Sequence, residues 1–309
     1  MNKYLLPPGF RDLLPDAAEQ EYFCTTSLIE NFYKHGYRLV ATPLVEFEES
    51  LFEGAGKALE PRTLKLIDPQ SQKTLGIRAD ITTQVSRLIS SRLSKAKLPL
   101  KLCYTGDIIR SYALNTRGQR QLKQAGVEFV DKKPNPAADA EIAILAIESL
   151  AKLGLKNLTI DLNTPNLIEK LGVKINDETK KLIEKRDISN LPPVIAELIK
   201  ASGSAEKSFT ALKKAKLPKT ALEQIEYCRQ VYEKIKKSNL TVNVTTDFVE
   251  NRGFEYHEIF SFSIFARDIR DELGRGGRYE INKTSATGFT IYINAFAEHV
   301  KIKLPAKKK

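Results

Sequence analysis

The sequence predicts an α+β domain in which helices lie on one side of an antiparallel β-sheet, with a helical insertion in the second half of the chain. Strands expected at residues 64–67 and 74–77 are joined by the turn-rich Asp68-Pro69-Gln70-Ser71, as in an antiparallel hairpin. Strands that adjoin through hairpins, with helices on one side, indicate an antiparallel sheet and not a doubly wound parallel one. From residue 164 to residue 240 the character of the chain changes, which predicts the insertion.

The first third of the chain begins with a helix. Asp16-Ala17-Ala18-Glu19 has the pattern of a capping box and predicts a helix to about His35, which Gly36 ends. A short strand is expected at residues 37–41, and Pro43 closes this strand or places it at a sheet edge. The elements expected next are a helix at 84–93, strands at 100–105 and 108–112, and a mobile loop at 113–118.

Residues 124–130 form the strand around which we expect the site to be built. Its two faces differ, because one carries Ala125, Val127 and Phe129 and the other carries Gln124, Gly126 and Glu128. The first face suits packing against a core, and the second is a polar floor. A glycine between an amide and a carboxylate lets the backbone come close to a small ligand such as an amino acid. An ordinary half-exposed strand explains these seven residues equally well.

The second half of the chain continues with a periodic helix at residues 137–153 and a strand at 158–162. In the insertion, helical segments rich in Lys, Glu and Leu alternate with breakers, which are Pro192-Pro193, Ser202-Gly203-Ser204 and Pro218. Further strands are expected at 240–245, 254–265 and 288–293. We therefore predict a core made of residues 1–163 and 241–300, an insertion at 164–240 and a basic tail at 301–309.

The composition is that of an ordinary soluble protein, with 42% apolar and 28% charged residues in 309. No apolar run reaches the roughly 18 residues that a membrane span needs, and residues 1–11 lack the apolar stretch of a signal peptide. We therefore expect a cytoplasmic protein with no membrane partner. The three cysteines and three histidines are scattered and show no CxxC spacing, so we expect no disulfide framework, no metal site and no cofactor.

The net charge of +11 would suit a nucleic-acid-binding protein if it lay near the polar floor. Residues 164–240 carry 16 basic and 10 acidic side chains, and residues 301–309 carry five lysines. These two stretches account for the whole excess, so the rest of the chain is neutral. A groove that follows phosphates should be rich in Lys and Arg, and we therefore expect no nucleic-acid partner. The alternative is an RNA-binding module made of the insertion and the tail.

Three short motifs have competing interpretations. The run Gly274-Arg275-Gly276-Gly277 lacks GxGxxG spacing and a strand-to-helix context, so a phosphate-binding loop is not favoured. Residues 252–257 combine a guanidinium that can fork onto a carboxylate with a glycine and two aromatic rings. His257 by itself is more often a half-buried strand histidine than a ligand contact. Asp80 and Thr82, just before a predicted helix, are by themselves better explained as helix caps.

Taken together, six ordered blocks resemble the catalytic core of histidyl-tRNA synthetases, and the resemblance runs nearly from end to end. The blocks are residues 8–15, 42–46, 78–82, 110–128, 252–257 and 276–279. Residues 45–51, 77–84 and 252–257 look more closely like the synthetase paralogues that serve as regulatory subunits of ATP phosphoribosyltransferase. The resemblance implies a class II aminoacyl-tRNA synthetase-like α+β fold that dimerises through its N-terminal helix and the adjacent strand.

Two departures from the synthetase pattern imply that this chain does not activate an amino acid. Where the synthetases pair an arginine with a glutamate that addresses adenine, this chain keeps Arg110 but has Tyr112. Where they carry an arginine that meets the ATP phosphates, this chain has Ala295. Loss of a cation that stabilises charge in adenylyl transfer commonly costs several kcal/mol of barrier. The chain also ends near Lys309, where a synthetase continues into an anticodon-binding domain.

The amino-acid pocket of the synthetases survives in the residue pattern. By resemblance, the α-amino group of histidine would be held by Asp80, Thr82 and Gln124, and its carboxylate by Arg252 and Gln124. Glu128 would accept from the imidazole and Tyr256 would form a wall. The histidine-binding set that we predict is Asp80, Thr82, Arg110, Gln124, Glu128, Arg252, Tyr256 and His257. Asp80 replaces a longer glutamate, and His257 stands where the synthetases have a tyrosine.

The resemblance therefore implies a regulatory subunit without catalytic residues of its own. Its partner would be the short-form catalytic subunit of ATP phosphoribosyltransferase, a glycosyltransferase that performs the first step of histidine biosynthesis. The homodimer would sit within a hetero-oligomer, be required for activity and confer feedback inhibition by histidine as the effector. The main alternative is an enzyme, namely a truncated histidyl-tRNA synthetase or another histidine-activating ligase.

Overall fold

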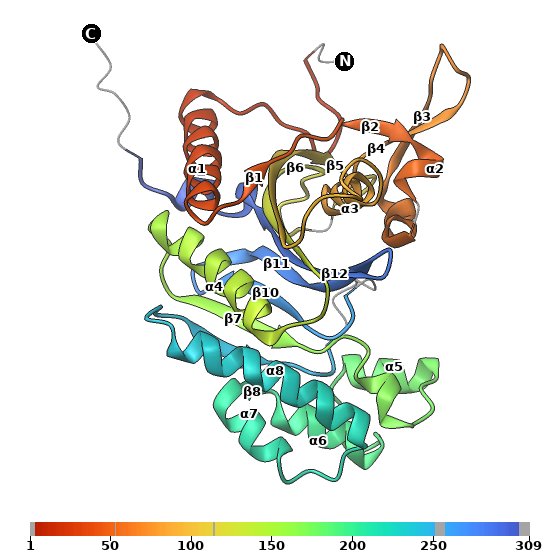
Figure 1. The fold of residues 1–309 in the computed structure, drawn as a ribbon, viewed down its shortest axis with the longest axis vertical. Coiled ribbons are helices and arrows are strands. Elements are labelled where there is room, and N and C mark those ends of the chain that lie inside the picture. The colour runs from red at the N-terminus through yellow and green to blue at the C-terminus, as the bar shows by residue number, and fades with distance from the viewer. Residues whose placement is uncertain (1–3, 53, 114, 251–256, 303–309) are drawn as a thin grey trace.

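The computed structural model describes residues 4–52, 54–113, 115–250 and 257–302, and within them the chain forms one nine-stranded sheet and one three-stranded sheet (Figure 1). The large sheet has the order β1-β5-β6-β12-β11-β10-β7-β9-β8, and the small one has the order β2-β4-β3. The strands are β1 (Arg38–Leu39), β2 (Val45–Phe47), β3 (Leu64–Ile67), β4 (Thr74–Ile77), β5 (Leu100–Ile109), β6 (Gln121–Asp131), β7 (Leu158–Asn163), β8 (Gly203–Ser204), β9 (Asn243–Thr246), β10 (Ser261–Ala266), β11 (Ile269–Ile281) and β12 (Thr284–Tyr292).

Helices cover the large sheet. The α-helices are α1 (Pro15–Lys34), α2 (Glu48–Leu51), α3 (Thr82–Ser91), α4 (Pro136–Lys152), α5 (Asp177–Glu184), α6 (Pro193–Ala201), α7 (Ala205–Leu212) and α8 (Lys219–Lys237). The 3₁₀ helices are η1 (Gly54–Arg62), η2 (Ile168–Leu171), η3 (Ile293–Ala295) and η4 (Ala297–His299). Helices α4 and α8 lie on one side of the sheet and α3 lies on the other, where the site is found (Figure 1).

The centre of the large sheet is antiparallel from β5 through β6, β12, β11 and β10 to β7, as the sequence predicts. Near its two ends the pairing is parallel, between β1 and β5 and between β7 and β9. The small sheet is the predicted hairpin of β3 and β4 with β2 added. The prediction of an α+β fold built on an antiparallel sheet is therefore confirmed. The expectation that the helices lie on one side of the sheet is wrong, because α3 lies on the face opposite α4 and α8.

Helix α1 has the predicted extent, but the capping box is wrong. The helix begins at Pro15, its N-cap is Leu14, and no side chain caps it. Proline is favoured in the first turn because its missing N–H would have no partner there, so the helix starts before Asp16 can act as the cap. The predicted stop is confirmed, since Gly36 has a φ of +81°.

A second correction concerns residues 100–112, where two strands were expected and one strand, β5, is found. Gly106, which falls in the gap between the two predicted strands, lies within that strand. A Cβ at this position would overlap the guanidinium of Arg78, which donates from Nε to the carbonyl of Asp107 at 2.6 Å. Gly106 is therefore required for a close approach and not for a turn.

The run from Gly274 to Tyr279 lies inside the long strand β11 and is paired on both sides, with β10 and with β12. It is not a loop, which agrees with the absence of a phosphate-binding pattern in the sequence. Side chains at positions 276 and 277 would overlap the backbones of the neighbouring strands, so glycine is needed at both. These glycines let three strands lie flat under the site.

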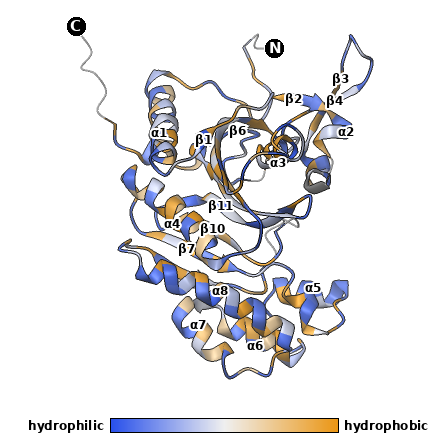
Figure 2. Ribbon diagram, in the orientation of Figure 1, coloured by the Kyte–Doolittle hydropathy of each residue, from blue (hydrophilic) through white to orange (hydrophobic). Residues whose placement is uncertain are grey.

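Helices α5–α8 and strand β8 fall within residues 164–240, where the sequence predicts an insertion; the boundaries 164 and 240 stay a prediction. This part is tied to the core by the pairing of β8 with β9 and by the packing of α8 against α4. Figure 2 shows that α8 carries many hydrophilic residues, whereas α4 is mostly hydrophobic. Among the described residues, none of the helices combines the length and the apolar character needed to cross a membrane.

Candidate functional site: an enclosed pocket on strands β6, β11 and β12

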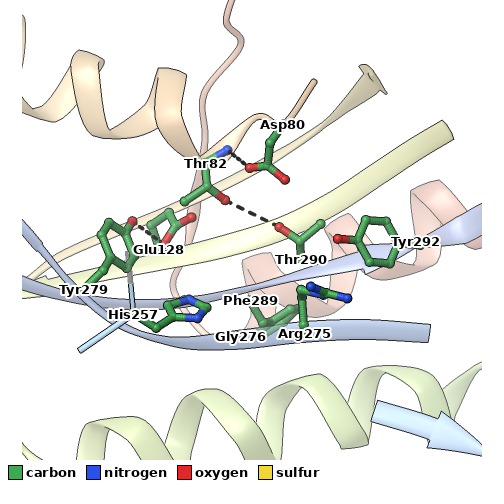
Figure 3. A pocket seen from close by; sticks show the side chains of 11 residues that line it. Asp80, Thr82, Glu128, His257, Arg275, Gly276, Tyr279, Phe289, Thr290 and Tyr292 are labelled. Atoms are coloured by element: carbon green, nitrogen blue, oxygen red, sulfur yellow. Dashed lines mark hydrogen bonds between the residues drawn. The ribbon is translucent and has the colours of Figure 1, made fainter. Parts of the chain in front are cut away.

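A small pocket lies on the face of the large sheet that carries α3 (Figure 3). Its lining residues are Asp80, Thr82, Glu128, His257, Arg275, Gly276, Tyr279, Gly288, Phe289, Thr290 and Tyr292. The empty space among them is about 270 Å³. That volume includes space open to solvent, so the kind of ligand is indicated by the polar and aromatic side chains of the lining and not by the volume. Figure 3 shows Glu128, Tyr279 and His257 together at one end, and Tyr292 with Arg275 at the other.

The floor strand is enclosed on both faces. Ala125 and Val127 are fully buried and Phe129 is 9% exposed, as expected for the core face. On the other face Gln124 and Glu128 are 0% and 1% exposed, so the interpretation as an ordinary half-exposed strand is wrong. Residues that are distant in the sequence contact this polar face, since Asp80 and Ile81 before α3 bond to Gln124 and Tyr279 of β11 bonds to Glu128. The polar floor is therefore the inside of a pocket and not a solvated surface.

Glu128 is the carboxyl group at the bottom of the pocket. It lies opposite Gly288 in the register of β6 and β12, and a Cβ on Gly288 would overlap both its carboxylate and the carbonyl of Val127. The hydroxyl of Tyr279 donates to Oε2 of Glu128 at 2.6 Å. Burial raises the pKa of Glu128 to about 8, although the hydroxyls of Tyr279 and Thr82 act in the opposite direction. In the empty pocket at neutral pH, Glu128 is therefore mostly protonated.

Gln124 organises the turn before α3. Its Nε2 donates to Oδ2 of Asp80 at 2.9 Å, and its Oε1 accepts from the N–H of Ile81 at 3.1 Å. The other oxygen of Asp80 accepts from the N–H of Thr82 at 2.9 Å. Asp80 thus bonds the first N–H of α3, but the N-cap of the helix is Ile81 and no side chain caps it, so neither Asp80 nor Thr82 is the helix cap. Asp80 also lines the pocket. Each carboxylate oxygen keeps a further lone pair with which it can accept from an ammonium group.

Three hydroxyl groups form a chain across the middle of the pocket. Oγ1 of Thr82 lies 3.1 Å from the hydroxyl of Tyr104, which lies 2.6 Å from Oγ1 of Thr290. Tyr104 is 1% exposed and fits over Gly126, where a side chain would overlap its ring. This network joins α3, β5 and β12, so it fixes the width of the pocket.

His257 lies at the same end as Glu128 and is 6% exposed. Its ring centroid is 6.5 Å from that of Tyr279, and its Cδ2 packs close to the position that a Cβ of Gly277 would take. Burial, with the nearby Arg275, lowers the pKa of His257 to about 3, so the ring is neutral at physiological pH. The histidine is therefore a wall of the pocket and not a cation.

The other four residues predicted to contact histidine either do not line the pocket or lie outside the described residues. Arg110 is 7% exposed but does not line the pocket; its guanidinium stacks over the ring of Tyr292 at 5.5 Å from the centroid. Gln124 lies directly behind Asp80 and not on the pocket surface. Arg252 and Tyr256 lie outside the described residues. The structure therefore brings Asp80, Thr82, Glu128 and His257 together. That the eight predicted residues contact a histidine ligand stays a prediction.

The loop predicted to be mobile is held down at Thr116 and Arg117. The N–H and the hydroxyl of Thr116 both donate to Oδ1 of Asp271, at 2.9 and 2.7 Å. Nε of Arg117 donates to the other oxygen of Asp271 at 3.1 Å, and its Nη2 lies 2.8 Å from Oε1 of Glu298. Nη2 also reaches the carbonyl of Ala295 at 3.4 Å. This guanidinium is thus fixed beside Ala295 with two carboxylates around it.

Sequence reasoning did not assign Tyr279, Thr290, Tyr104 or Arg275 to the site. Tyr279 could have been found, because it lies two residues after Gly277 in a strand and so shares a face with it. Tyr104 and Thr290 depend on the pairing of β5, β6 and β12, which are far apart in the sequence. Within the described part of the chain, no group of three His, Cys, Asp or Glu side chains could hold a metal ion.

The chain is similar to known proteins over nearly its whole length. The family model of histidyl-tRNA synthetase matches residues 9–296. The ATP phosphoribosyltransferase regulatory subunit of Paramagnetospirillum magneticum is 37% identical, over 99% of this chain and 84% of that protein. The protein of the same name from Rhodospirillum centenum is 38% identical, over 93% of this chain and 78% of that protein.

Among solved structures, an ATP phosphoribosyltransferase regulatory subunit/histidyl-tRNA synthetase from Bacillus halodurans superposes with a TM-score of 0.83 at 22% identity, covering 98% of this chain and 84% of that one. The histidyl-tRNA synthetase of Nostoc gives a TM-score of 0.76 at 16% identity, covering 96% and 74%. The fold is therefore that of a class II aminoacyl-tRNA synthetase-like domain, as the resemblance implied. Within that class, the chain belongs to the family of ATP phosphoribosyltransferase regulatory subunits.

Proposed function

We propose that this chain is the regulatory, non-catalytic subunit of a short-form ATP phosphoribosyltransferase, and that its enclosed pocket binds free histidine as the feedback effector. The catalytic partner would perform the first step of histidine biosynthesis in the cytoplasm, with this subunit needed for activity and for inhibition. The observation that carries the proposal is the enclosed end of the pocket. There Glu128, Tyr279, Asp80 and Thr82 are kept in place by buried partners.

The chemistry of these groups fits a free amino acid. Glu128 can exchange a hydrogen bond or a proton with an imidazole, because its raised pKa lies close to the pH range in which imidazole titrates. Asp80 and the hydroxyl chain offer acceptors for an α-amino group. The role of Arg252 as the carboxylate ligand is part of the proposal and rests on the resemblance.

The alternative, an enzyme that activates histidine with ATP, has less support. Beside Ala295 the guanidinium of Arg117 is held by Asp271 and Glu298, so its charge is already compensated. Histidine-dependent exchange of pyrophosphate into ATP by the purified chain would establish this alternative and overturn our proposal.

A homodimer within the hetero-oligomer is also part of the proposal. The edge strand β1 has β5 as its neighbour on one side in the large sheet, and exposed apolar side chains lie close to it in the chain. On α1 the rings of Tyr22 and Tyr33 are 72% and 48% exposed, and Leu39 of β1 is 46% exposed. Large exposed apolar side chains near a sheet edge suit a second copy of the chain.

The test is co-purification with a short-form phosphoribosyltransferase, followed by activity assays with and without histidine. We expect the complex to be active and to be inhibited by histidine. Glu128→Ala should abolish the inhibition while the complex still assembles, because the change is confined to an enclosed pocket. The matched control is Asp131→Ala, which removes a carboxylate from the same strand outside the pocket. Inhibition that persists unchanged in Glu128→Ala would show that this pocket is not the sensor.

A further inference from the structure

The small sheet turns an apolar face outward. Because side chains alternate along a strand, the register of β2, β4 and β3 places two rows of three residues on one face. The residues are Val45, Ile77 and Leu64 in the first row and Phe47, Leu75 and Leu66 in the second. Every position of this face within the three strands is therefore apolar, and we call these six residues the outer face.

The opposite face of the small sheet packs against the chain itself. Gly76 lies under Leu51 of α2, whose side chain a Cβ at position 76 would overlap. Glu46 accepts from Nε2 of Gln84 at 2.9 Å and from Nε of Arg87 at 3.0 Å, both in α3. A sheet with one solvated face ordinarily presents its polar residues to water. In this sheet the pattern is reversed, since Glu46 points inward and the apolar residues do not.

The outer face is open to solvent in the single chain. Phe47 is 42% and Leu66 is 40% exposed, and the other four residues are partly exposed. Within the described part of the chain, none of the six belongs to the hydrophobic core or to the side chains that pack against it. At one edge Nζ of Lys73 lies 5.4 Å from the centroid of the Phe47 ring. Contiguous apolar side chains in this number mark a surface that another protein covers.

Resting on the homodimer of the proposed function, we propose that a second copy of this chain covers the outer face, in addition to the contact expected at α1 and β1. Exposed apolar side chains connect the two regions, because Leu39 of β1 is 46% exposed and Leu44, just before β2, is 43% exposed. In the view of Figure 1, β1 lies between α1 and the small sheet. The apolar surface thus continues along the chain from the edge of the large sheet to the outer face.

The composition of the outer face suits a second copy. In a two-fold dimer the same patch occurs on both sides, so the patch must be complementary to itself. A face without charges meets this condition, because neither copy brings a charge that the other would leave buried and unpaired.

The size of the contact points to one interface that includes α1 and β1. A stable interface uses ~20–30 residues on each side, and the outer face supplies six. The exposed rings of α1 add Tyr22, Phe23 and Tyr33. Neither region is large enough by itself, so a single two-fold contact that spans both is the arrangement that covers them.

The experiment is sedimentation velocity of the full chain over a range of concentrations. Leu66→Asp and Phe47→Asp should each weaken dimerisation at least about 100-fold, because a charge in an apolar contact stays without a partner. The matched control is Ile67→Asp, since Ile67 is 60% exposed on the opposite face of the same strand and its change should leave the dimer intact. The assembly state is measured without histidine, so a failed sensing role of the pocket would leave this result unchanged.

A second measurement introduces no charge and decides the question if an aspartate variant does not fold. The three native thiols are buried, so a thiol placed on the surface can be followed by itself. The thiol of Leu66→Cys should react with a maleimide at least about tenfold more slowly in the dimer than after dilution to the monomer, because the contact excludes solvent. The thiol of Ile67→Cys should react at the same rate in both.

Two outcomes overturn the inference. One is a dimer in Leu66→Asp and Phe47→Asp that is as stable as that of the wild type. If those variants also fail to co-purify with the catalytic subunit, the outer face binds that partner instead. The other is a thiol of Leu66→Cys that reacts equally fast in dimer and monomer. A wild-type chain that stays monomeric would overturn the homodimer of the proposed function, and this inference with it.

Discussion

The two ends of the pocket are built on the same strands but differ in what they offer a ligand. At one end Glu128 and Tyr279 are buried and uncrowded, because Gly288 has no side chain. Beyond the other end, outside the residues that line the pocket, Arg110 is stacked on Tyr292, and Arg117 is enclosed by Asp271 and Glu298 next to Ala295. Under the proposed function, the pocket binds an amino acid although its neighbouring cations do not point at a phosphate. Recognition and activation would then be separable because they depend on different residues.

The largest effect on the Glu128 end of the pocket is expected from a side chain that fills the space above Gly288. In Gly288→Ala the new methyl group overlaps the Glu128 carboxylate and the Val127 carbonyl, so the floor must move. We expect a loss of histidine affinity of at least about 100-fold, which is ~2.8 kcal/mol, measured by titration calorimetry. Overpacking should also lower the free energy of unfolding by ~1–3 kcal/mol. Gly36→Asn is the control, because that glycine has open space and a positive φ that asparagine tolerates.

A smaller effect is expected from Tyr279→Phe. This change removes the hydroxyl that orients Glu128, and a hydrogen bond of this kind contributes ~0.5–1.5 kcal/mol. Histidine affinity should therefore fall about threefold to tenfold. Tyr232→Phe removes a hydroxyl from α8, outside the pocket, and should have no effect on binding. An unchanged affinity in Tyr279→Phe would show that this hydroxyl does not contribute to histidine binding.

The protonation of Glu128 gives a pH-dependent prediction. Its pKa rises from 4.5 to about 8 on folding, so the folded chain keeps a proton that the unfolded chain releases. Stability should therefore fall as pH rises from about 4.5 to 8 and change little, through this group, above that range. Glu128→Gln keeps the neutral form. Its melting temperature relative to wild type should be higher at pH 8 than at pH 5 by at least ~2–4 °C, the shift caused by about 1 kcal/mol.

That prediction is checked by thermal unfolding of both proteins across the pH range. Asp131→Asn, on the same strand outside the pocket, is the control and should show no such trend. A difference between Glu128→Gln and wild type that stays constant from pH 5 to pH 8 would mean that Glu128 is ionised in the empty pocket.

The smallest effect on histidine binding is expected from a change at Asp271, beside Ala295. Asp271→Ala removes the acceptor of Thr116 and Arg117, so the loop should be cleaved faster by trypsin after Arg117. Histidine affinity should change less than about twofold, since the contacts of Glu128 and Asp80 are not involved. Asp268→Ala, in the exposed turn before β11, is the control for proteolysis. A tenfold loss of affinity in Asp271→Ala would show that the two ends are coupled.

Much of the fold could be predicted because its signals are local. Strands β3 and β4 have the predicted bounds, and β6 contains the predicted floor strand, since alternation and turn residues identify them. The single strand β5 was predicted as two strands. The close approach of Arg78 to Gly106, in the middle of β5, joins residues that are distant in the sequence and could not be predicted from it. The parallel pairing of β1 with β5 also rests on contacts between distant residues.

Part of the candidate site could also be predicted because its signals are local in the sequence. Asp80, Thr82, Glu128 and His257 belong to short motifs and do line the pocket. Arg110 was assigned to the ligand, but its position above Tyr292 depends on how β12 lies beside β6. The burial of the polar face of β6 could not be predicted from alternation alone, because it depends on residues distant in the sequence, such as Asp80, Ile81 and Tyr279, that contact Gln124 and Glu128.

The most direct measurement is titration of the wild-type chain, first with histidine and then with ATP. The account predicts saturable binding of one histidine per chain, loss of that binding in Glu128→Ala, and no heat on addition of ATP to the histidine complex. Binding of ATP that depends on histidine and leads to pyrophosphate release would contradict it, as would a wild-type chain that takes up no histidine.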